Sequence, residues 1–282
     1  MPWKPRGSAL GHYMACTYRA AFDRALAEGL LEIDPTLVSV IEEKKKSSPY
    51  ADLGTCIHYH LQAGLGCTFP GKPELYAPTP EQEANAAALF QGNRDKCQNA
   101  IRASAVLAAQ HLPKLPDTEK WAAEVHVKTR DFTGHIDFLQ VNCGLIADLK
   151  TTSKPPLSPY VKPAHLVQLL AYADAIEEAN GRPEVPVLHT GIVLYVDAQN
   201  ANWAMPIPVD LRSEGMIEYR SQVRAFAASI RSKTLYKIAH PSIGAACEDW
   251  CPYTVLCRDR YQSGKGEMLR PTMPTLKGPL HA

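Results

Sequence analysis

No stretch of this 282-residue chain is apolar over anything near the roughly 20 residues that a membrane-spanning helix needs. Residues 1–6, Met-Pro-Trp-Lys-Pro-Arg, do not provide the apolar core of a signal peptide either. We therefore expect a cytoplasmic protein without a membrane partner. The chain also has no excess of charge, with 30 basic and 29 acidic residues and a formal net charge of +1. This balance neither requires nor excludes a nucleic-acid partner, because a local basic groove can lie on a neutral protein.

Hydrophobic residues make up 45% of the chain and charged residues 21%, which is ordinary for a soluble globular protein. The length suffices for a sizeable core, either as one large domain or as one domain with a helical insertion. Cysteine is the exception, since eight cysteines in a cytosolic chain of this size favour metal ligation over disulfides.

Residues 134–151 contain two apolar, β-prone runs, and the Asn-Cys-Gly between them is typical of a tight hairpin connection. Each run carries a carboxylate where a buried strand should have none, Asp137 in the first and Asp148 in the second. Side chains alternate along a strand, so Asp148 and Lys150 share one face, and Asp137 can reach the same spot from the neighbouring strand. Burying these charges is costly unless a cation or a reacting group satisfies them. From spacing alone, a structural ion pair between Asp148 and Lys150 explains the pattern equally well.

Further upstream, Ser48 followed by proline predicts the start of a helix whose apolar stripe is formed by Leu53, Ile57 and Leu61. His58 lies on the edge of this stripe. A histidine in that place is either a hydrogen-bonded core residue or, because the helix leads towards the acidic strands, a metal ligand.

Four motifs in one order along the chain resemble the PD-(D/E)XK nuclease superfamily. The hairpin carries Gly-x-x-Asp and, after ten further residues, Asp-x-Lys. A downstream Gln-x-x-x-Tyr is similar to a motif of the RecB-type branch, and an upstream Gly-x-x-x-His resembles the motif in which that branch carries a histidine. The residues concerned are Gly54, His58, Gly134, Asp137, Asp148, Lys150, Gln168 and Tyr172.

The resemblance implies an α/β fold, with a central mixed β-sheet flanked by helices in a restriction-endonuclease-like core, and with helical additions and a metal-cluster region built on four cysteines. We expect a single nuclease domain over residues 1–261 with a helical insertion over 79–112, and a poorly ordered tail over 262–282. Periodicity and turn residues predict helices over 8–30, 163–180 and 210–230, and further strands over 122–130, 188–196 and 203–209.

For the site, the resemblance implies that Asp137 and Asp148, with His58 and the carbonyl of Leu149, hold one or two Mg²⁺ or Mn²⁺ ions. A histidine ligand makes Mn²⁺ the better suited of the two. Lys150 would orient the attacking water and share the negative charge that builds on the phosphate.

Three more residues have implied or open roles. Gln168 and Tyr172 are four residues apart on one helical face, and the resemblance favours a role in gripping the substrate backbone over a surface hydrogen-bonding pair. Glu124 resembles an acidic residue that many relatives carry just before Gly-x-x-Asp. It is either a group that supports the metal site from outside or an ordinary residue of a partly solvated strand face.

A second constellation consists of Cys247, Cys251 and Cys257, which indicate a metal site because three cysteines lie within eleven residues. Cys16 is the best candidate for the fourth ligand. This pattern resembles the iron–sulfur nucleases of the RecB-type branch, namely the AddB nuclease domain and the CRISPR-associated exonuclease family, and implies a [4Fe–4S] cluster. Those relatives also open with the residue types found here at Ser8, Tyr13, Cys16 and Phe22.

Structural Zn²⁺ is the alternative at this site, since four thiolates also suit it. The gap before the second of the three carboxy-terminal cysteines is three residues here and two in those relatives. Such a site would tie the first helix to the carboxy-terminal segment and would be mainly structural.

The function implied by the resemblance is metal-dependent hydrolysis of phosphodiester bonds in DNA, as an exonuclease on single strands or DNA ends. Recombination, DNA repair and CRISPR adaptation are all compatible settings, and proteins of those pathways are the candidate partners. The alternative is a non-catalytic, cluster-bearing module that binds DNA or docks a partner on a nuclease-like fold. The intact set of Asp137, Asp148 and Lys150 argues against that alternative.

Overall fold

The computed structural model describes residues 4–15, 17–29, 39–43, 48–156, 160–180 and 188–232. Its centre is a five-stranded sheet in the order β1-β2-β3-β4-β5, in which β3 and β4 run parallel and the other neighbours run antiparallel. The predicted mixed sheet with flanking helices is confirmed. The strands are β1 (Ala122–Lys128), β2 (Thr133–Gln140), β3 (Leu145–Thr152), β4 (Thr190–Asp197) and β5 (Ala204–Asp210).

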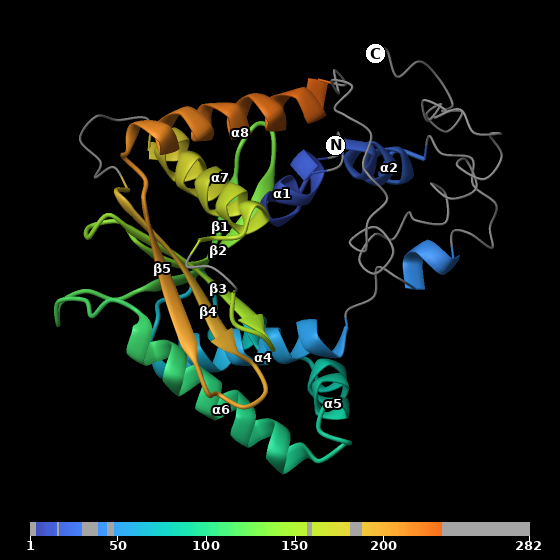
Figure 1. The fold of residues 1–282 in the computed structure, drawn as a ribbon, viewed down its shortest axis with the longest axis vertical. Coiled ribbons are helices and arrows are strands. Elements are labelled where there is room, and N and C mark those ends of the chain that lie inside the picture. Colours follow the sequence, from blue (N-terminus) through green and yellow to red (C-terminus); the bar gives the residue numbers. More distant parts are fainter. Residues whose placement is uncertain are drawn as a thin grey trace.

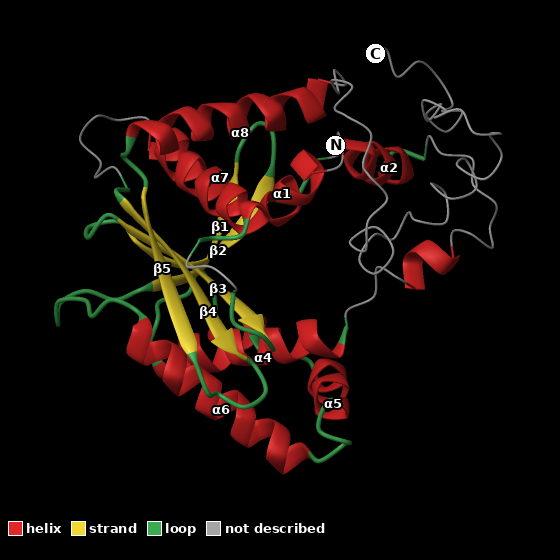
Figure 2. Ribbon diagram, viewed as in Figure 1, coloured by secondary structure: helices red, strands yellow, loops and turns green. Residues whose placement is uncertain are grey.

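Helices cover both faces of the sheet (Figure 1). On one side lie α1 (Gly7–Ala15), α7 (Pro163–Asn180) and α8 (Glu214–Ser232), and on the other lie α4 (Pro49–Gly64), α5 (Pro80–Ala88) and α6 (Arg94–His111). The parallel pair β3–β4 requires a crossover, and α7 lies between these strands in the chain order. Figure 2 shows α7 as a helix on one side of the sheet. The remaining elements are α2 (Thr17–Ala27) and the short 3₁₀-helix η1 (Pro73–Tyr76).

Each helical layer has its own hydrophobic core. On the α7 side, Leu169, Ile136 and Tyr195 are among the fully buried residues, and on the α4 side Ile57, Phe138 and Leu149 are. Aliphatic and aromatic burial of this extent supplies most of the favourable free energy of folding. The sheet is therefore fixed from both faces, and the polar groups at its centre are held by a rigid frame.

The start of α4 agrees with the prediction from the sequence. Ser48 is the N-cap, its Oγ accepts a hydrogen bond of 3.2 Å from the Ala51 N–H, and Pro49 occupies the first helical position. The predicted hairpin is also confirmed by the β2–β3 pairing. The described residues of the segment predicted as a helix over 8–30 are largely helical, in α1 (Gly7–Ala15) and α2 (Thr17–Ala27).

The helix α1 packs very closely on α7. A Cβ built on Gly11 would lie 2.5 Å from the carbonyl oxygen of Ala164 and against its Cα, so only glycine permits this approach. Within the described ranges, no helix has both the length and the apolarity needed to cross a membrane.

Candidate active site

The site begins where β2 and β3 separate. Phe138 pairs with Ala147, and one step further along this register Asp137 stands opposite Asp148, where no ladder pair is formed. The Leu149 N–H instead donates a 2.8 Å hydrogen bond to Oδ2 of Asp137. A carboxylate thus replaces a strand carbonyl as acceptor, and the opening creates a fork between the two strands.

Inside the fork, Asp148, Lys150 and Gln168 form a closed set of polar contacts. The Lys150 ammonium lies 3.0 Å from Oδ1 of Asp148 and 2.8 Å from Oδ2. The Gln168 amide donates to Asp148 Oδ1 at 2.9 Å, and its oxygen accepts from Lys150 Nζ at 3.0 Å. Asp148 and Gln168 are 2% and 6% exposed, so these hydrogen bonds satisfy groups that water does not reach.

His58 and Asp137 face each other at the mouth of the fork, with 3.5 Å between His58 Nδ1 and Asp137 Oδ2. One helical turn further along α4, Gln62 donates to Glu124 Oε1 at 2.9 Å and to the Asp137 carbonyl at 3.3 Å. Sequence reasoning missed Gln62. Its spacing of four residues from His58 is the signal that could have found it, because residues four apart share a helical face.

Glu124 has a backbone conformation that a strand residue rarely adopts, with φ at +52°. Ala123 pairs with Phe138 and Val125 with Ile136, so Glu124 stands opposite Asp137 in the β1–β2 register. A left-handed conformation costs a non-glycine residue of order 1 kcal/mol or more and is found preferentially at functional sites. Here it places the Glu124 carboxylate beside Gln62, at the edge of the fork.

Burial controls the protonation of the acidic groups. It raises the pKa of Asp137 to about 6 and that of Asp148 to about 6, although the Lys150 ammonium acts in the opposite direction on both. Burial also lowers the pKa of Lys150, but attraction by Asp148 and Asp137 outweighs it, and the pKa of the ammonium is raised above its ordinary value. Lys150 is therefore positively charged at neutral pH.

His58 is a neutral imidazole at pH 7, because burial and then the nearby Lys150 ammonium lower its pKa to about 4. A neutral imidazole has a free lone pair for a metal ion. A bound cation stabilises desolvated carboxylates with raised pKa values most strongly, because it offsets the cost of burying their negative charge.

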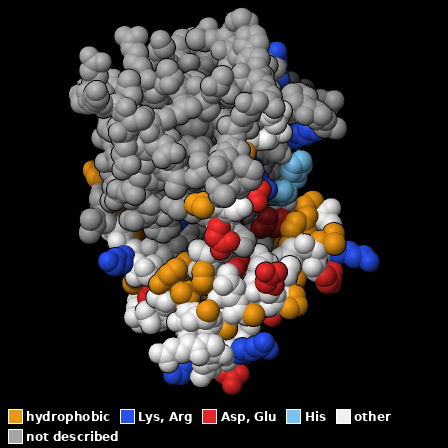
Figure 3. Space-filling view, turned by 90° about the vertical axis from the view of Figure 1, so that its right-hand side faces the viewer, with side chains coloured by type: hydrophobic (Ala, Val, Ile, Leu, Met, Phe, Trp, Pro, Cys, Tyr) orange, Lys and Arg blue, Asp and Glu red, His pale blue; other side chains and the backbone are white. Residues whose placement is uncertain are grey.

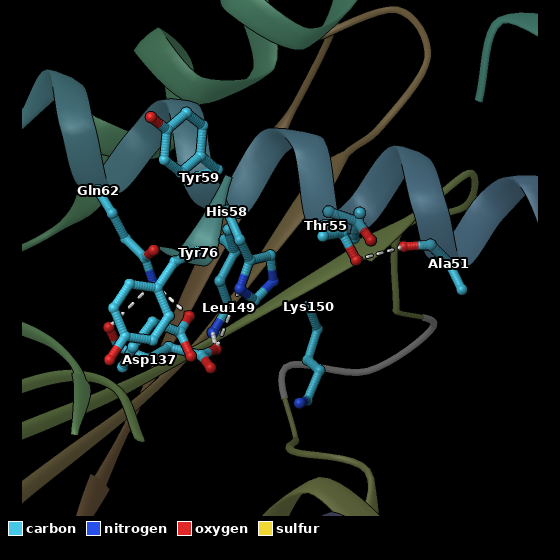
Figure 4. A pocket seen from close by; sticks show the side chains of 12 residues that line it. Ala51, Thr55, His58, Tyr59, Gln62, Tyr76, Asp137, Leu149 and Lys150 are labelled. Atoms are coloured by element: carbon cyan, nitrogen blue, oxygen red, sulfur yellow. Dashed lines mark hydrogen bonds and ion pairs between the residues drawn. The ribbon is translucent and has the colours of Figure 1, made fainter. Parts of the chain in front are cut away.

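The fork opens into a cavity of about 430 Å³. Figure 4 shows His58, Asp137 and Leu149 close to one another, with Lys150 beside them. The side of the molecule that looks to the right in Figure 1 presents acidic, histidine and hydrophobic side chains next to one another (Figure 3). The cavity is lined by Ala51, Gly54, Thr55, His58, Tyr59, Gln62, Tyr76, Glu124, Asp137, Leu149, Lys150 and Thr151.

The donor set fits a hard divalent cation in its chemistry. Asp148 Oδ2 is buried and accepts no hydrogen bond from the described residues, although the Lys150 ammonium lies 2.8 Å from it. In the described part of the chain, no three His, Cys, Asp or Glu side chains converge on one point. A backbone carbonyl, such as that of Leu149, and water would have to complete the coordination, as is common for Mg²⁺ and Mn²⁺.

Tyr172 is buried on the α7 side and sets the position of the Gly-x-x-Asp motif. A Cβ on Gly134 would lie 2.6 Å from both Cε1 and Oη of Tyr172, so the ring occupies the space that glycine leaves. The Tyr172 hydroxyl is hydrogen-bonded to the Gln168 side chain and the His135 backbone, and burial raises its pKa. Gln168 and Tyr172 thus contact the acidic strands directly, and both are buried.

The predicted cluster ligands Cys16, Cys247, Cys251 and Cys257 lie outside the described residues, as does the predicted tail over 262–282. The other four cysteines are free thiols: Cys56 and Cys97 are buried, and Cys67 and Cys143 are partly buried.

Comparisons with known proteins concern both the sequence and the structure. The family model of the PD-(D/E)XK nuclease superfamily matches residues 8–258. The crystal structure of SSO0001 is similar at 14% identity with a TM-score of 0.33, over 78% of this chain and 93% of that one. A comparison with curated proteins gives no match.

Proposed function

The chain belongs to the PD-(D/E)XK nuclease superfamily, and from this premise we propose that it hydrolyses phosphodiester bonds of DNA at the fork between β2 and β3. The observation that carries the proposal is the buried contact set of Asp148, Lys150 and Gln168 next to Asp137. A structural ion pair needs only two partners. Here a third group orients the ammonium, and the set borders an open cavity, which favours a reactive centre.

Members of this superfamily generally use Mg²⁺ or Mn²⁺, and we assign Asp137, Asp148, His58 and the Leu149 carbonyl to hold such an ion. When bound, the ion supplies a water of lowered pKa and stabilises charge on the phosphate. Because His58 is neutral at pH 7, it can serve as a ligand without first losing a proton.

Lys150 acts through its charge. Attraction by the Asp148 and Asp137 carboxylates raises its pKa, so in this arrangement it is a charged donor at neutral pH. The ammonium can donate to the attacking water and to a phosphate oxygen, and a preorganised donor of this kind favours the transition state over the ground state. Gln168 is a positioning residue, because it fixes the direction in which Lys150 points.

We further propose exonuclease action on single strands or free ends, in DNA recombination, repair or CRISPR adaptation. The support is the similarity of the motifs to the iron–sulfur nucleases of the RecB-type branch. The same similarity supports a [4Fe–4S] cluster at Cys16, Cys247, Cys251 and Cys257. Iron analysis of anaerobically purified protein tests the cluster: a brown, iron-containing protein is expected, and a colourless zinc-containing one would contradict it.

The nuclease proposal is tested with end-labelled single- and double-stranded DNA and Mn²⁺. We expect the wild type to cleave and Asp148→Ala to lose at least about 10³-fold in rate, because a metal ligand and the partner of Lys150 are both removed. Asp148→Asn keeps the size of the side chain and should be equally inactive. Asp117→Asn, in an exposed loop, is the matched control and should retain full activity. A wild type that leaves both substrates intact contradicts catalysis and favours a non-catalytic binding module.

A second prediction concerns Asp137 and pH. Its pKa is about 6 in the folded protein against an ordinary value of 3.8, so the unfolded state releases the proton more readily. The metal-free protein therefore loses stability from this group as pH rises from about 4 to about 6. Asp137→Asn removes this loss and should be more stable than the wild type at pH 7.5 in EDTA, by about 1–3 kcal/mol.

Thermal unfolding in EDTA and in Mn²⁺ measures the effect. At pH 4 the variant and the wild type should unfold alike, and Mn²⁺ at pH 7.5 should raise the melting temperature of the wild type much more than that of Asp137→Asn. Equal melting temperatures in EDTA at pH 7.5 would show that burial of the Asp137 charge does not destabilise the fold. An undiminished Mn²⁺ shift in the variant would show that Asp137 is not a metal ligand.

A further inference from the structure

Two tyrosines line the same cavity as His58 and Asp137. Tyr59 comes from α4, and Tyr76 comes from the last position of η1. Figure 4 shows the Tyr76 ring beside Gln62 and Asp137. The roles assigned above to the charged groups do not use either ring.

Tyr76 is held in place by an aromatic neighbour. Its ring stacks on Phe69, with 5.4 Å between the ring centroids and 25° between the planes. The loop that carries Phe69 is fixed to β1: the Thr68 N–H donates to the Trp121 carbonyl at 2.9 Å, and the Ala123 N–H donates to the Thr68 carbonyl at 2.8 Å. The stacked pair is therefore anchored one residue from Glu124.

The surroundings of Tyr76 select a neutral, flat ligand. The carboxylates of Glu124 and Asp137 line the same cavity, and they repel a phosphate that neither a metal cation nor the Lys150 ammonium shields. An uncharged aromatic ring meets no such repulsion and gains dispersion and stacking energy against tyrosine. A cavity of about 430 Å³ is within the range of small-ligand sites and can take a nucleoside.

We propose that Tyr76, backed by Phe69, is a stacking platform for the nucleobase adjacent to the reacting phosphate. The inference rests on the proposed nuclease function and names a feature of its substrate. A base inside a duplex is stacked on both neighbours, so a base on Tyr76 must be unstacked. The platform thus makes an unpaired nucleotide at the cleavage point the preferred substrate, and it reads no sequence because every base has an aromatic face.

Cleavage of an end-labelled single strand with one abasic residue tests the platform, because product mapping gives the rate at every phosphodiester bond. With Mn²⁺, the wild type should cleave the bond next to the abasic residue about tenfold more slowly than the others, since stacking of one base is lost there. Tyr76→Ala should lower the rate at all bonds about tenfold. It should show no additional slowing at the bond next to the abasic residue, an effect that we call the abasic dip. Tyr76→Phe keeps the ring and should behave as the wild type does.

Leu75→Ala is the matched control, because Leu75 is in the same 3₁₀ turn and is 76% exposed. It should keep both the overall rate and the abasic dip. A purely structural role of Tyr76 would lower the rate but leave the dip in Tyr76→Ala, and this result overturns the platform. An active wild type without any dip overturns the platform alone. A wild type that cleaves nothing overturns the nuclease function and the platform together.

Discussion

Lys150→Met should abolish DNA cleavage and at the same time increase the stabilisation that Mn²⁺ gives to the protein. Methionine keeps the apolar stem and removes the ammonium, so the buried Asp148 carboxylate loses its ionic partner. Removing one member of a buried ion pair typically costs about 3–5 kcal/mol, because the other charge remains desolvated. A divalent cation that binds Asp137 and Asp148 then neutralises charge that no lysine offsets.

Activity should fall at least about 10³-fold, as expected when a preorganised donor to the transition state is lost. The rate is measured with Mn²⁺ and end-labelled DNA, and thermal unfolding is measured in EDTA and in Mn²⁺ at pH 7.5. In EDTA the variant should be less stable than the wild type by about 3 kcal/mol, and Mn²⁺ should restore a large part of this difference. Lys114→Met, in an exposed loop, should change neither quantity. Retained activity would show that Lys150 has no role in the reaction. An unchanged Mn²⁺ effect on stability would show that Asp148 does not bind the metal ion.

Gly11→Ala should strongly destabilise the fold, although it adds only one methyl group. The new Cβ would meet backbone atoms of Ala164, and unlike a side-chain end these cannot turn away. Overpacking costs about 1–3 kcal/mol where side chains can adjust, so we expect about 3 kcal/mol or more here. A loss of this size lowers the melting temperature of a domain of this length by roughly 6–12 °C.

The control for this variant is Gly215→Ala in α8, where a Cβ meets nothing within 4 Å. It should raise stability by about 0.5–1 kcal/mol, because alanine loses less backbone entropy in a helix than glycine does. Equal melting temperatures of Gly11→Ala and the wild type would show that α1 and α7 do not pack as described. Because α7 carries Gln168 and Tyr172, the folded fraction of Gly11→Ala should also cleave DNA more slowly.

Local patterns predicted much of the fold. The two apolar, β-prone runs around Asp137 and Asp148, with Asn-Cys-Gly between them, predicted the hairpin. Ser48 and the following proline predicted the start of α4. The apolar spacing over residues 8–30 predicted helix, and the described residues of this segment are largely helical in α1 and α2.

Features of the site that depend on contacts between distant elements have weak or no signals in the sequence. The spacing of Gln62 from His58 indicates only a shared helical face, and its partners, Glu124 and the Asp137 carbonyl, are brought to it by β1 and β2. The left-handed conformation of Glu124 has no local signal, since glutamate does not favour it. Gln168 lies at the flank of an apolar stripe, and only the closing of α7 onto β3 shows that it is buried.

The fork joins two groups of residues that differ in how far apart their members lie in the chain. Asp148, Lys150 and Gln168 lie within 20 residues of one another, on a strand and the helix that follows it. His58, Glu124 and Asp137 meet only after segments 66–79 residues apart in the chain have come together. Contacts between near neighbours form with a smaller loss of chain entropy. The lysine side of the catalytic centre should therefore assemble first, and the cation-binding side should become competent only when the chain has nearly reached its native topology.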